Sequence, residues 1–286
     1  MTNAGLDISE WARDGVNIVP LQGHRVVGGK VMPIGAAPVA GVARLTYRGG
    51  PLIARVRLFG VYWGSAWRAM GRASGSSPVR EVSRQALDTF LGDLAAGAYM
   101  DILAEYDAQG ATIQRGTFLG SAVVGPDPAA RVSDDDIRAM LTQRLADGEL
   151  PPWDANTLYV VYLPQGTSVE QGGALSCRVF CGYHDAIVDQ GGNPLAYYAV
   201  LPYPGCAGCA QGMDGMQLSP FDALTTTTSH EVAEAVTDPV PGTGWYDDQN
   251  GEIGDICAWQ LAMLDSYVVQ KEWSNAAGDC VGPAGG

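Results

Sequence analysis

The alternation of apolar and polar residues predicts most of the strands in this chain. Residues 41–47 and 52–59 alternate on either side of Arg48-Gly49-Gly50-Pro51, a pattern that predicts a β-hairpin. Further strands are expected near 117–124 and 267–273, and short apolar runs at 158–163 and 196–201 predict buried strands. Residues 1–40 are rich in Gly and Pro and have weak apolar patterning, so we expect an irregular N-terminal lead-in there.

Apolar positions at helical spacing predict three helical regions. The Ser77-Pro78 pair marks a helix start, and the apolar positions after it predict one or two amphipathic helices up to Tyr106. Another helix is expected over 133–145, and a third after Ser219-Pro220. Because strands and helices alternate without a strict βαβ order, the sequence predicts a single α+β domain over residues 41–286, with a mixed sheet, packed helices and many loops.

The third of these helices carries the most informative motif. His230 and Glu234 are four residues apart, so they project from one helix face, with Glu231 roughly one hundred degrees further round. This layout matches the HExxH helix of zinc peptidases, except that Glu234 replaces the second His. The sequence therefore predicts a zincin-like metal site with two ligands on this helix and Glu231 as the base. A surface helix without metal is the alternative.

Acidic residues downstream of the helix can complete the site. Glu252 lies 18 positions beyond Glu234, and the prolines and glycines between them let the chain turn back. We expect Glu252 to be the third ligand, and Asp255 to be either an alternative ligand or the acceptor that orients His230. Asp247 opens a run that resembles part of a calcium loop but lacks its full spacing, so calcium is a weaker expectation than zinc.

This ligand set predicts a metal-dependent hydrolase, with a peptidase as the leading reaction class. Glu231 would accept the proton of a water molecule as the water attacks a carbonyl carbon, and His184 or Tyr246 would stabilise the oxyanion. For His184, a purely structural role is the competing interpretation. The alternative function is a non-catalytic extracellular binding protein with a structural metal or none. An exposed Glu231 would favour the enzyme, and a buried site would favour the binding protein.

Composition narrows the function classes. The chain has 286 residues, with 17 Lys and Arg against 31 Asp and Glu; this net charge of −14 disfavours a nucleic-acid partner, because phosphate binding needs a basic surface. No uninterrupted apolar run is long enough for a transmembrane helix, and residues 1–7 lack the features of a signal peptide. The six cysteines indicate either three disulfides or a four-thiolate zinc site built from the first four.

A series of short motifs runs in a defined order between residues 42 and 281. They are Leu45-Thr46-Tyr47-Arg48-Gly49-Gly50-Pro51, Tyr62-Trp63-Gly64, Phe180-Cys181-Gly182-Tyr183-His184, Cys206-Ala207-Gly208-Cys209, His230-Glu231-Val232-Ala233-Glu234, Trp245-Tyr246, Glu252-Ile253-Gly254-Asp255-Ile256-Cys257, Trp273 and Cys280. The series resembles the Exordium, or phosphate-induced, family of secreted cell-wall proteins, and the chain looks like a bacterial relative of it.

The resemblance implies an extracellular setting, and hence disulfides rather than a thiolate zinc site. The expected pairs are Cys177 with Cys181, Cys206 with Cys209, and Cys257 with Cys280. The family supplies no settled biochemical activity, so the expected partner is a peptide or protein substrate or a cell-wall component. The departure from the family is the N-terminus, where an export signal is expected.

Overall fold

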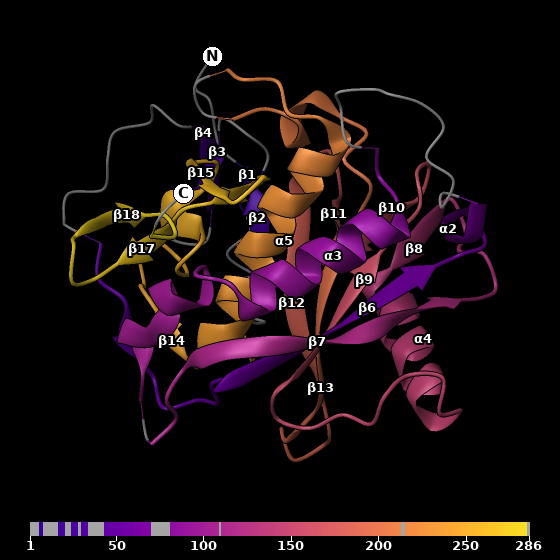
Figure 1. Ribbon diagram of the computed structural model, residues 1–286, viewed down its shortest axis with the longest axis horizontal. Coiled ribbons are helices and arrows are strands. Elements are labelled where there is room, and N and C mark those ends of the chain that lie inside the picture. The colour runs from indigo at the N-terminus through magenta and orange to yellow at the C-terminus, as the bar shows by residue number, and fades with distance from the viewer. Residues whose placement is uncertain are drawn as a thin grey trace.

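A six-stranded mixed sheet forms the centre of the protein (Figure 1). The structure is a computed structural model that describes residues 6–7, 17–20, 24–27, 30–33, 43–69, 81–108, 110–212 and 215–284. The sheet has the order β2-β12-β13-β9-β6-β7. Its strands are β2 (Asn17–Pro20), β6 (Arg55–Trp63), β7 (Gln114–Val124), β9 (Thr157–Tyr162), β12 (Phe180–Val188) and β13 (Pro194–Leu201). The predicted mixed sheet is confirmed.

Four adjacent strands of the sheet, β13, β9, β6 and β7, run parallel, whereas β12 and β2 pair antiparallel at one edge. Parallel neighbours need long crossover connections: the segments from β6 to β7 and from β6 to β9 contain helices, whereas the segment from β9 to β13 contains β10, β11 and β12. The longer helical elements are α2 (Ala66–Ala69), α3 (Arg84–Ala96), η1 (Met100–Tyr106), α4 (Asp134–Ala146) and α5 (Pro220–Thr237). The sequence pattern did not reveal this parallel arrangement.

Helices cover both faces of the sheet, which is why β9 is a continuous buried run. Leu158 and Val160 of β9 point into one core, together with residues of α3, η1 and α5. Tyr159 and Val161 point into the opposite core, together with residues of α4. Successive strand residues face opposite sides, so each strand contributes to both cores.

Two of the three predicted helix starts lie in the described residues, and both agree with the structure. Ser133 caps α4 in a capping box with Asp136, and Ser219 accepts a hydrogen bond from the Asp222 N–H at the start of α5. The predicted starts of these two helices are confirmed. The predicted start at Ser77-Pro78 lies outside the described residues, and α3 follows the N-cap Ser83.

The predicted hairpin around Arg48–Pro51 is wrong. β5 (Thr46–Tyr47) pairs with β14 (Trp245–Tyr246), and β6 lies between β7 and β9. The N–H groups of Arg48 and Gly50 donate to the carbonyls of Gly244 and Thr243, so this segment bonds to a distant loop. Alternation indicates that a segment is a strand, but it does not identify the partner strand.

The N-terminal residues expected to be an irregular lead-in contain four short strands. β2 is the edge strand of the main sheet, while β1 (Leu6–Asp7), β3 (His24–Val27) and β4 (Lys30–Pro33) form a small separate sheet. The remaining elements are β8 (Arg131–Ser133), β10 (Ser168–Gln171), β11 (Ala174–Leu175), η2 (Ala207–Cys209), η3 (Asp255–Cys257), β15 (Leu261–Leu264), β16 (Tyr267–Gln270), β17 (Glu272–Ser274) and β18 (Asp279–Val281). Within the ranges given above, no helix is long and apolar enough to cross a bilayer.

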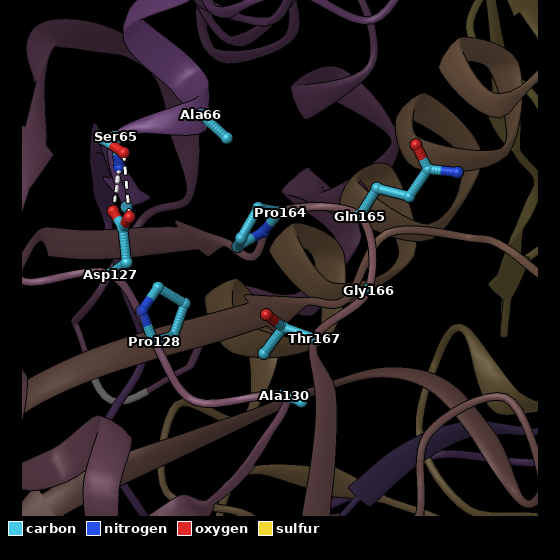
Figure 2. Close-up of a pocket in the computed structure, with 10 residues that line it drawn as sticks. Ser65, Ala66, Asp127, Pro128, Ala130, Pro164, Gln165, Gly166 and Thr167 are labelled. Atoms are coloured by element: carbon cyan, nitrogen blue, oxygen red, sulfur yellow. Dashed lines mark hydrogen bonds between the residues drawn. The ribbon is translucent and has the colours of Figure 1, made fainter.

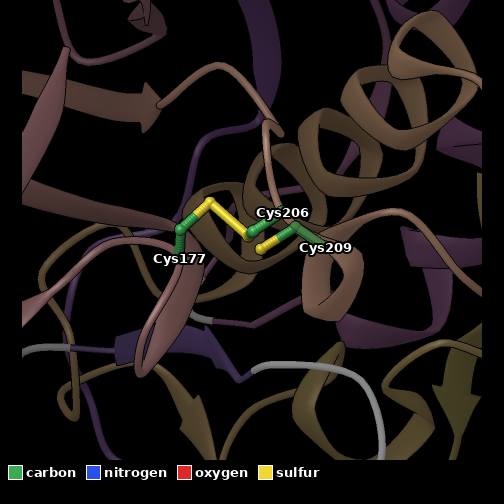
Figure 3. Close-up of side chains that lie close together, drawn as sticks. All are labelled: Cys177, Cys206 and Cys209. Carbon is green, nitrogen blue, oxygen red and sulfur yellow. A yellow bond between two sulfur atoms is a disulfide. The ribbon is translucent and has the colours of Figure 1, made fainter. Parts of the chain in front are cut away.

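All six cysteines form disulfides, which rules out the four-thiolate zinc site. The predicted Cys257–Cys280 bond is confirmed and joins η3 to β18. The two other predicted pairs are wrong, because the loop carrying η2 lies against the start of β12 and brings distant cysteines together. The observed bonds are Cys177–Cys206 and Cys181–Cys209, with Cα–Cα distances of 5.8 and 5.6 Å. Figure 3 shows the first of them, with Cys209 beside it.

Candidate metal centre

Helix α5 lies against β12 on the face opposite α4, and the site forms between them. Tyr183 of β12 points into the core under α4, so the next residue, His184, points towards α5. Gly182 faces α5 as well. A Cβ at this position would lie 2.7 Å from Thr227 Cγ2 and 3.0 Å from Glu231 Oε1. The absence of a side chain at Gly182 therefore lets the helix approach the strand.

Six ionisable side chains meet at this contact and form what we call the central cluster. Asp255 is 4% exposed and the other five are completely buried. The members are His184, His230, Glu231, Glu234, Glu252 and Asp255. They include every residue that the sequence predicted as a metal ligand, together with the predicted base.

Glu234 is the centre of the cluster, because it belongs to two groups that could each hold a metal ion. The first group is His230, Glu234 and Asp255, and the second is His184, Glu234 and Glu252. Within each group, one ligand atom from each residue lies within 4.8 Å of the others. The structure thus pairs His230 with Asp255, the alternative ligand, whereas the preferred third ligand Glu252 lies with His184.

His184 lies between α5 and Asp238, the residue that follows this helix. Its Nδ1 lies 3.2 Å from Glu231 Oε2 and 3.5 Å from Glu234 Oε2. Its Nε2 lies 3.2 Å from the carbonyl oxygen of Asp238 and 3.8 Å from Glu252 Oε1. Burial lowers the pKa of His184, but the two helix carboxylates outweigh it and raise this pKa to about 10.

His230 is surrounded on its other side by residues that follow α5. Its Nε2 lies 2.9 Å from Glu234 Oε1, and its Nδ1 lies 2.7 Å from Gln270 Nε2. A Cβ on Gly254 would lie 2.8–2.9 Å from three ring atoms of His230, so this position has no room for a side chain. Burial lowers the pKa of His230, but the charges of Glu234 and Glu231 raise it well above its usual value.

The carboxyl groups of the cluster are buried close to one another, and this shifts their pKa values. Burial raises the pKa of Glu231, and burial together with neighbouring carboxylates raises those of Glu252 and Asp255. Burial alone would also raise the pKa of Glu234, but the two imidazoles outweigh it and lower this pKa. Removing several carboxylates from water at one point is costly unless a cation compensates them.

Several buried polar atoms of the cluster lack hydrogen-bond partners within the described ranges. They are Glu231 Oε1, Glu234 Oε2, Glu252 Oε1 and Oε2, and Asp255 Oδ1, while His230 Nε2 has only its contact of 2.9 Å with Glu234 Oε1. Unsatisfied oxygen and nitrogen atoms that converge in a dry interior are what a metal ion requires. The residues present therefore fit a divalent ion.

The two other predicted features lie beside the cluster. Tyr246 is half-buried, with the Arg48 guanidinium 4.3 Å from its ring centre. Burial and the charges of Asp255 and Glu252 raise the pKa of Tyr246. Asp247, from the suggested calcium loop, accepts backbone N–H groups with both carboxylate oxygens, so those oxygens are already used.

Two buried polar residues near the cluster were not predicted. Gln270 ends β16 and contacts His230, and Glu272 of β17 accepts a hydrogen bond of 2.6 Å from the Tyr99 hydroxyl. Both belong to the segment 267–273, which the sequence predicts as one strand and which the structure divides into β16 and β17. A polar residue following the apolar run Tyr267-Val268-Val269 was the available signal.

A pocket elsewhere on the protein is separate from this cluster. It lies between the residues after β6, the turn after β7 and the turn after β9, as Figure 2 shows. Ser65 donates to Asp127 with a distance of 2.9 Å from Oγ to Oδ2, so this pair satisfies its own polar groups. The pocket lining contains no member of the central cluster.

No protein-family model matches this sequence, and no curated protein matches it. The resemblance to the Exordium family therefore rests on the ordered motifs alone.

Proposed function

We propose that this protein is a secreted metal-dependent hydrolase, a zinc peptidase whose metal ion is held around Glu234. The residues that would hold the ion are Glu234 with His230 and Asp255, or Glu234 with His184 and Glu252. The three disulfides support an oxidising, extracellular location, in agreement with the resemblance to the Exordium family.

The observation that carries the proposal is the position of Glu231. This carboxylate lies beside both metal-binding groups, and its Oε1 has no hydrogen-bond partner among the described residues. A bound divalent ion would polarise a carbonyl group and make a nearby water molecule more acidic. Glu231 would accept the proton of that water as it attacks the carbonyl carbon, and would then pass the proton to the leaving amine.

The burial of the cluster favours a second function. No cluster residue is more than 4% exposed, so a substrate would reach Glu231 only after the surrounding segments open. A metal ion enclosed in this way would stabilise α5, β12 and η3 relative to one another without catalysis. The second candidate is therefore a non-catalytic extracellular binding protein with a structural metal ion.

The Glu231→Gln variant separates the two functions. Both functions predict that the variant keeps its metal, but the hydrolase should lose about 10²–10⁴-fold in rate because the base is gone. The assay follows cleavage of a broad peptide library by zinc-loaded protein, before and after chelation. Glu272→Gln is the matched control, because it is also a buried Glu but lies outside the cluster.

The hydrolase predicts zinc-dependent cleavage by wild type and by Glu272→Gln. Equal cleavage by Glu231→Gln would remove Glu231 as the base. If zinc-loaded wild type cleaves no peptide of the library, the binding protein becomes the better account.

A further inference from the structure

We infer that the two imidazoles have different roles: His184 binds the metal ion through Nδ1, and His230 keeps a proton on Nε2 and donates a hydrogen bond into the cluster. The inference rests on the proposed metal site and deepens it. It reverses the roles that the HExxE spacing predicts, in which His230 is the ligand and His184 the donor.

The position of the proton on His230 follows from Gln270. The Gln270 side-chain oxygen accepts the Trp259 N–H at 2.9 Å, and its nitrogen donates to the Gly254 carbonyl at 2.9 Å. These two contacts fix the amide, because a flip would set oxygen against oxygen and N–H against N–H. The same nitrogen lies 2.7 Å from His230 Nδ1, so Nδ1 must accept a hydrogen bond and carries no proton.

With Nδ1 unprotonated, the neutral ring of His230 has its proton on Nε2. The neighbouring carboxylates favour a second proton on this ring, but that proton would have to sit on Nδ1, against the Gln270 NH₂ group. A donor-to-donor contact at 2.7 Å opposes that second proton. A nitrogen that carries a proton has no lone pair for a metal, so His230 Nε2 cannot be the ligand.

His184 has the opposite arrangement. Its Nε2 faces the Asp238 carbonyl oxygen, which can only accept, so the proton of the neutral ring is on Nε2. A metal-binding His usually donates its second N–H to a carbonyl or carboxylate in this manner. Nδ1 faces the carboxylates of Glu231 and Glu234, where a second proton sits in the metal-free protein and a bound cation would take the place of that proton.

The distances distinguish the two rings as well. Ligands that share a tetrahedral zinc ion at about 2.0–2.2 Å lie roughly 3.4 Å from each other. His184 Nδ1 is 3.5 Å from Glu234 Oε2, as two ligands of one ion would be. His230 Nε2 is only 2.9 Å from Glu234 Oε1, a separation typical of hydrogen-bonded atoms.

The reversed roles give each ring a function in the proposed metal site. His184 would hold the ion between β12 and α5 together with Glu234. The Nε2–H of His230 would donate to Glu234 Oε1, 2.9 Å away, and so orient this carboxylate towards the ion.

Nitrogen NMR of the metal-free wild-type protein tests the proton positions directly. The chain has three histidines, so the ring signals can be assigned by substituting each in turn. The inference predicts His230 protonated on Nε2 alone, and a shift of the His184 Nδ1 signal when zinc is added. A proton on His230 Nδ1, or a zinc-induced shift confined to His230 Nε2, would overturn it.

A matched pair of variants tests the ligand. His184→Gln can still donate to the Asp238 carbonyl but has no nitrogen at the Nδ1 position, whereas His230→Gln keeps an N–H near the Nε2 position. Loss of a residue that only hydrogen-bonds to a metal ligand already lowers metal affinity by about 10–100-fold. We therefore expect zinc affinity to fall by more than about 100-fold in His184→Gln and by less in His230→Gln. Near-UV circular dichroism checks that both variants fold.

The outcomes separate this inference from the proposed function. A larger loss of affinity in His230→Gln, or equal losses in both variants, would overturn the exchange of roles and leave the metal site intact. If wild type itself binds no zinc, the proposed function fails together with the inference.

Discussion

Substitution of Gly254 by Ala should destabilise the protein through a single contact with His230. The new Cβ would lie 2.8 Å from His230 Nδ1 and 2.9 Å from Cε1 and Cγ, well inside normal van der Waals separation. The backbone of Gly254 is in the right-handed helical region, with φ −79° and ψ −37°, so Ala meets no conformational strain there. The whole cost is therefore steric.

The magnitude follows from two opposing terms. Overpacking a well-packed interior costs about 1–3 kcal/mol, and replacing Gly by Ala recovers about 0.4–1 kcal/mol from the unfolded chain. We expect Gly254→Ala to lower the free energy of unfolding by about 1–2 kcal/mol. The matched control is Gly92→Ala in α3, where the nearest atom to a new Cβ is Phe118 Cβ at 3.9 Å.

Urea unfolding of wild type and both variants measures the difference. Gly92→Ala should be as stable as wild type or more stable, because Ala is favoured over Gly within a helix by about 0.5–1 kcal/mol. If Gly254→Ala is as stable as the control variant, the close packing of Gly254 on the imidazole is refuted, and with it the fixed orientation of His230.

Three further predictions concern the disulfides and the metal. Peptide mapping without reduction should find Cys177 with Cys206 and Cys181 with Cys209, and six free thiols in the denatured, unreduced protein would contradict this. Replacing Cys257 and Cys280 together by Ala should lower the free energy of unfolding by about 3 kcal/mol, as loop entropy predicts for a separation of 23 residues; an unchanged value would refute that estimate. Zinc at about one hundred times its dissociation constant should raise the free energy of unfolding by about 2.7 kcal/mol, and chelation should reverse the gain. An unfolding transition that zinc does not move would argue against a site in the folded state.

The local signals in the sequence located the elements that form the site. Ser219-Pro220 marks the start of α5 correctly, because an N-cap followed by a first-turn proline depends only on neighbouring residues. The spacing of His230 and Glu234 likewise places them on one helix face whatever the rest of the fold does. The turn after the helix brings Glu252 and Asp255 back to it, as the breakers in the sequence indicated.

Features that depend on distant partners could not be predicted in the same way. The disulfide partner of Cys181 is set by how the η2 loop packs on β12, and nearness in sequence gave the wrong partner. The segment around Gly50 likewise pairs with residues near Thr243 because the tertiary fold, and not nearness in sequence, brings the two segments together. Nothing near His184 showed that it lies on a central strand facing α5.

The position of the proton on His230 is the clearest example of a feature that the sequence could not predict. The motif spacing brings His230 close to Glu234, but the spacing cannot say which ring nitrogen carries the proton. That depends on a hydrogen-bond chain from Trp259, in the turn after η3, through Gln270 of β16 to His230 of α5. Only the tertiary structure supplies this information.

Zinc titration of metal-free protein by calorimetry tests the central claim, that the buried cluster binds a divalent ion. Glu234 belongs to both candidate groups, so Glu234→Gln should abolish binding whichever imidazole is the ligand. Glu149→Gln, an exposed position that pairs with Arg144, is the control and should bind as wild type does. Saturable binding in wild type and in the control, lost in Glu234→Gln, is the predicted result. No saturable binding by wild type, or undiminished binding by Glu234→Gln, would contradict the account.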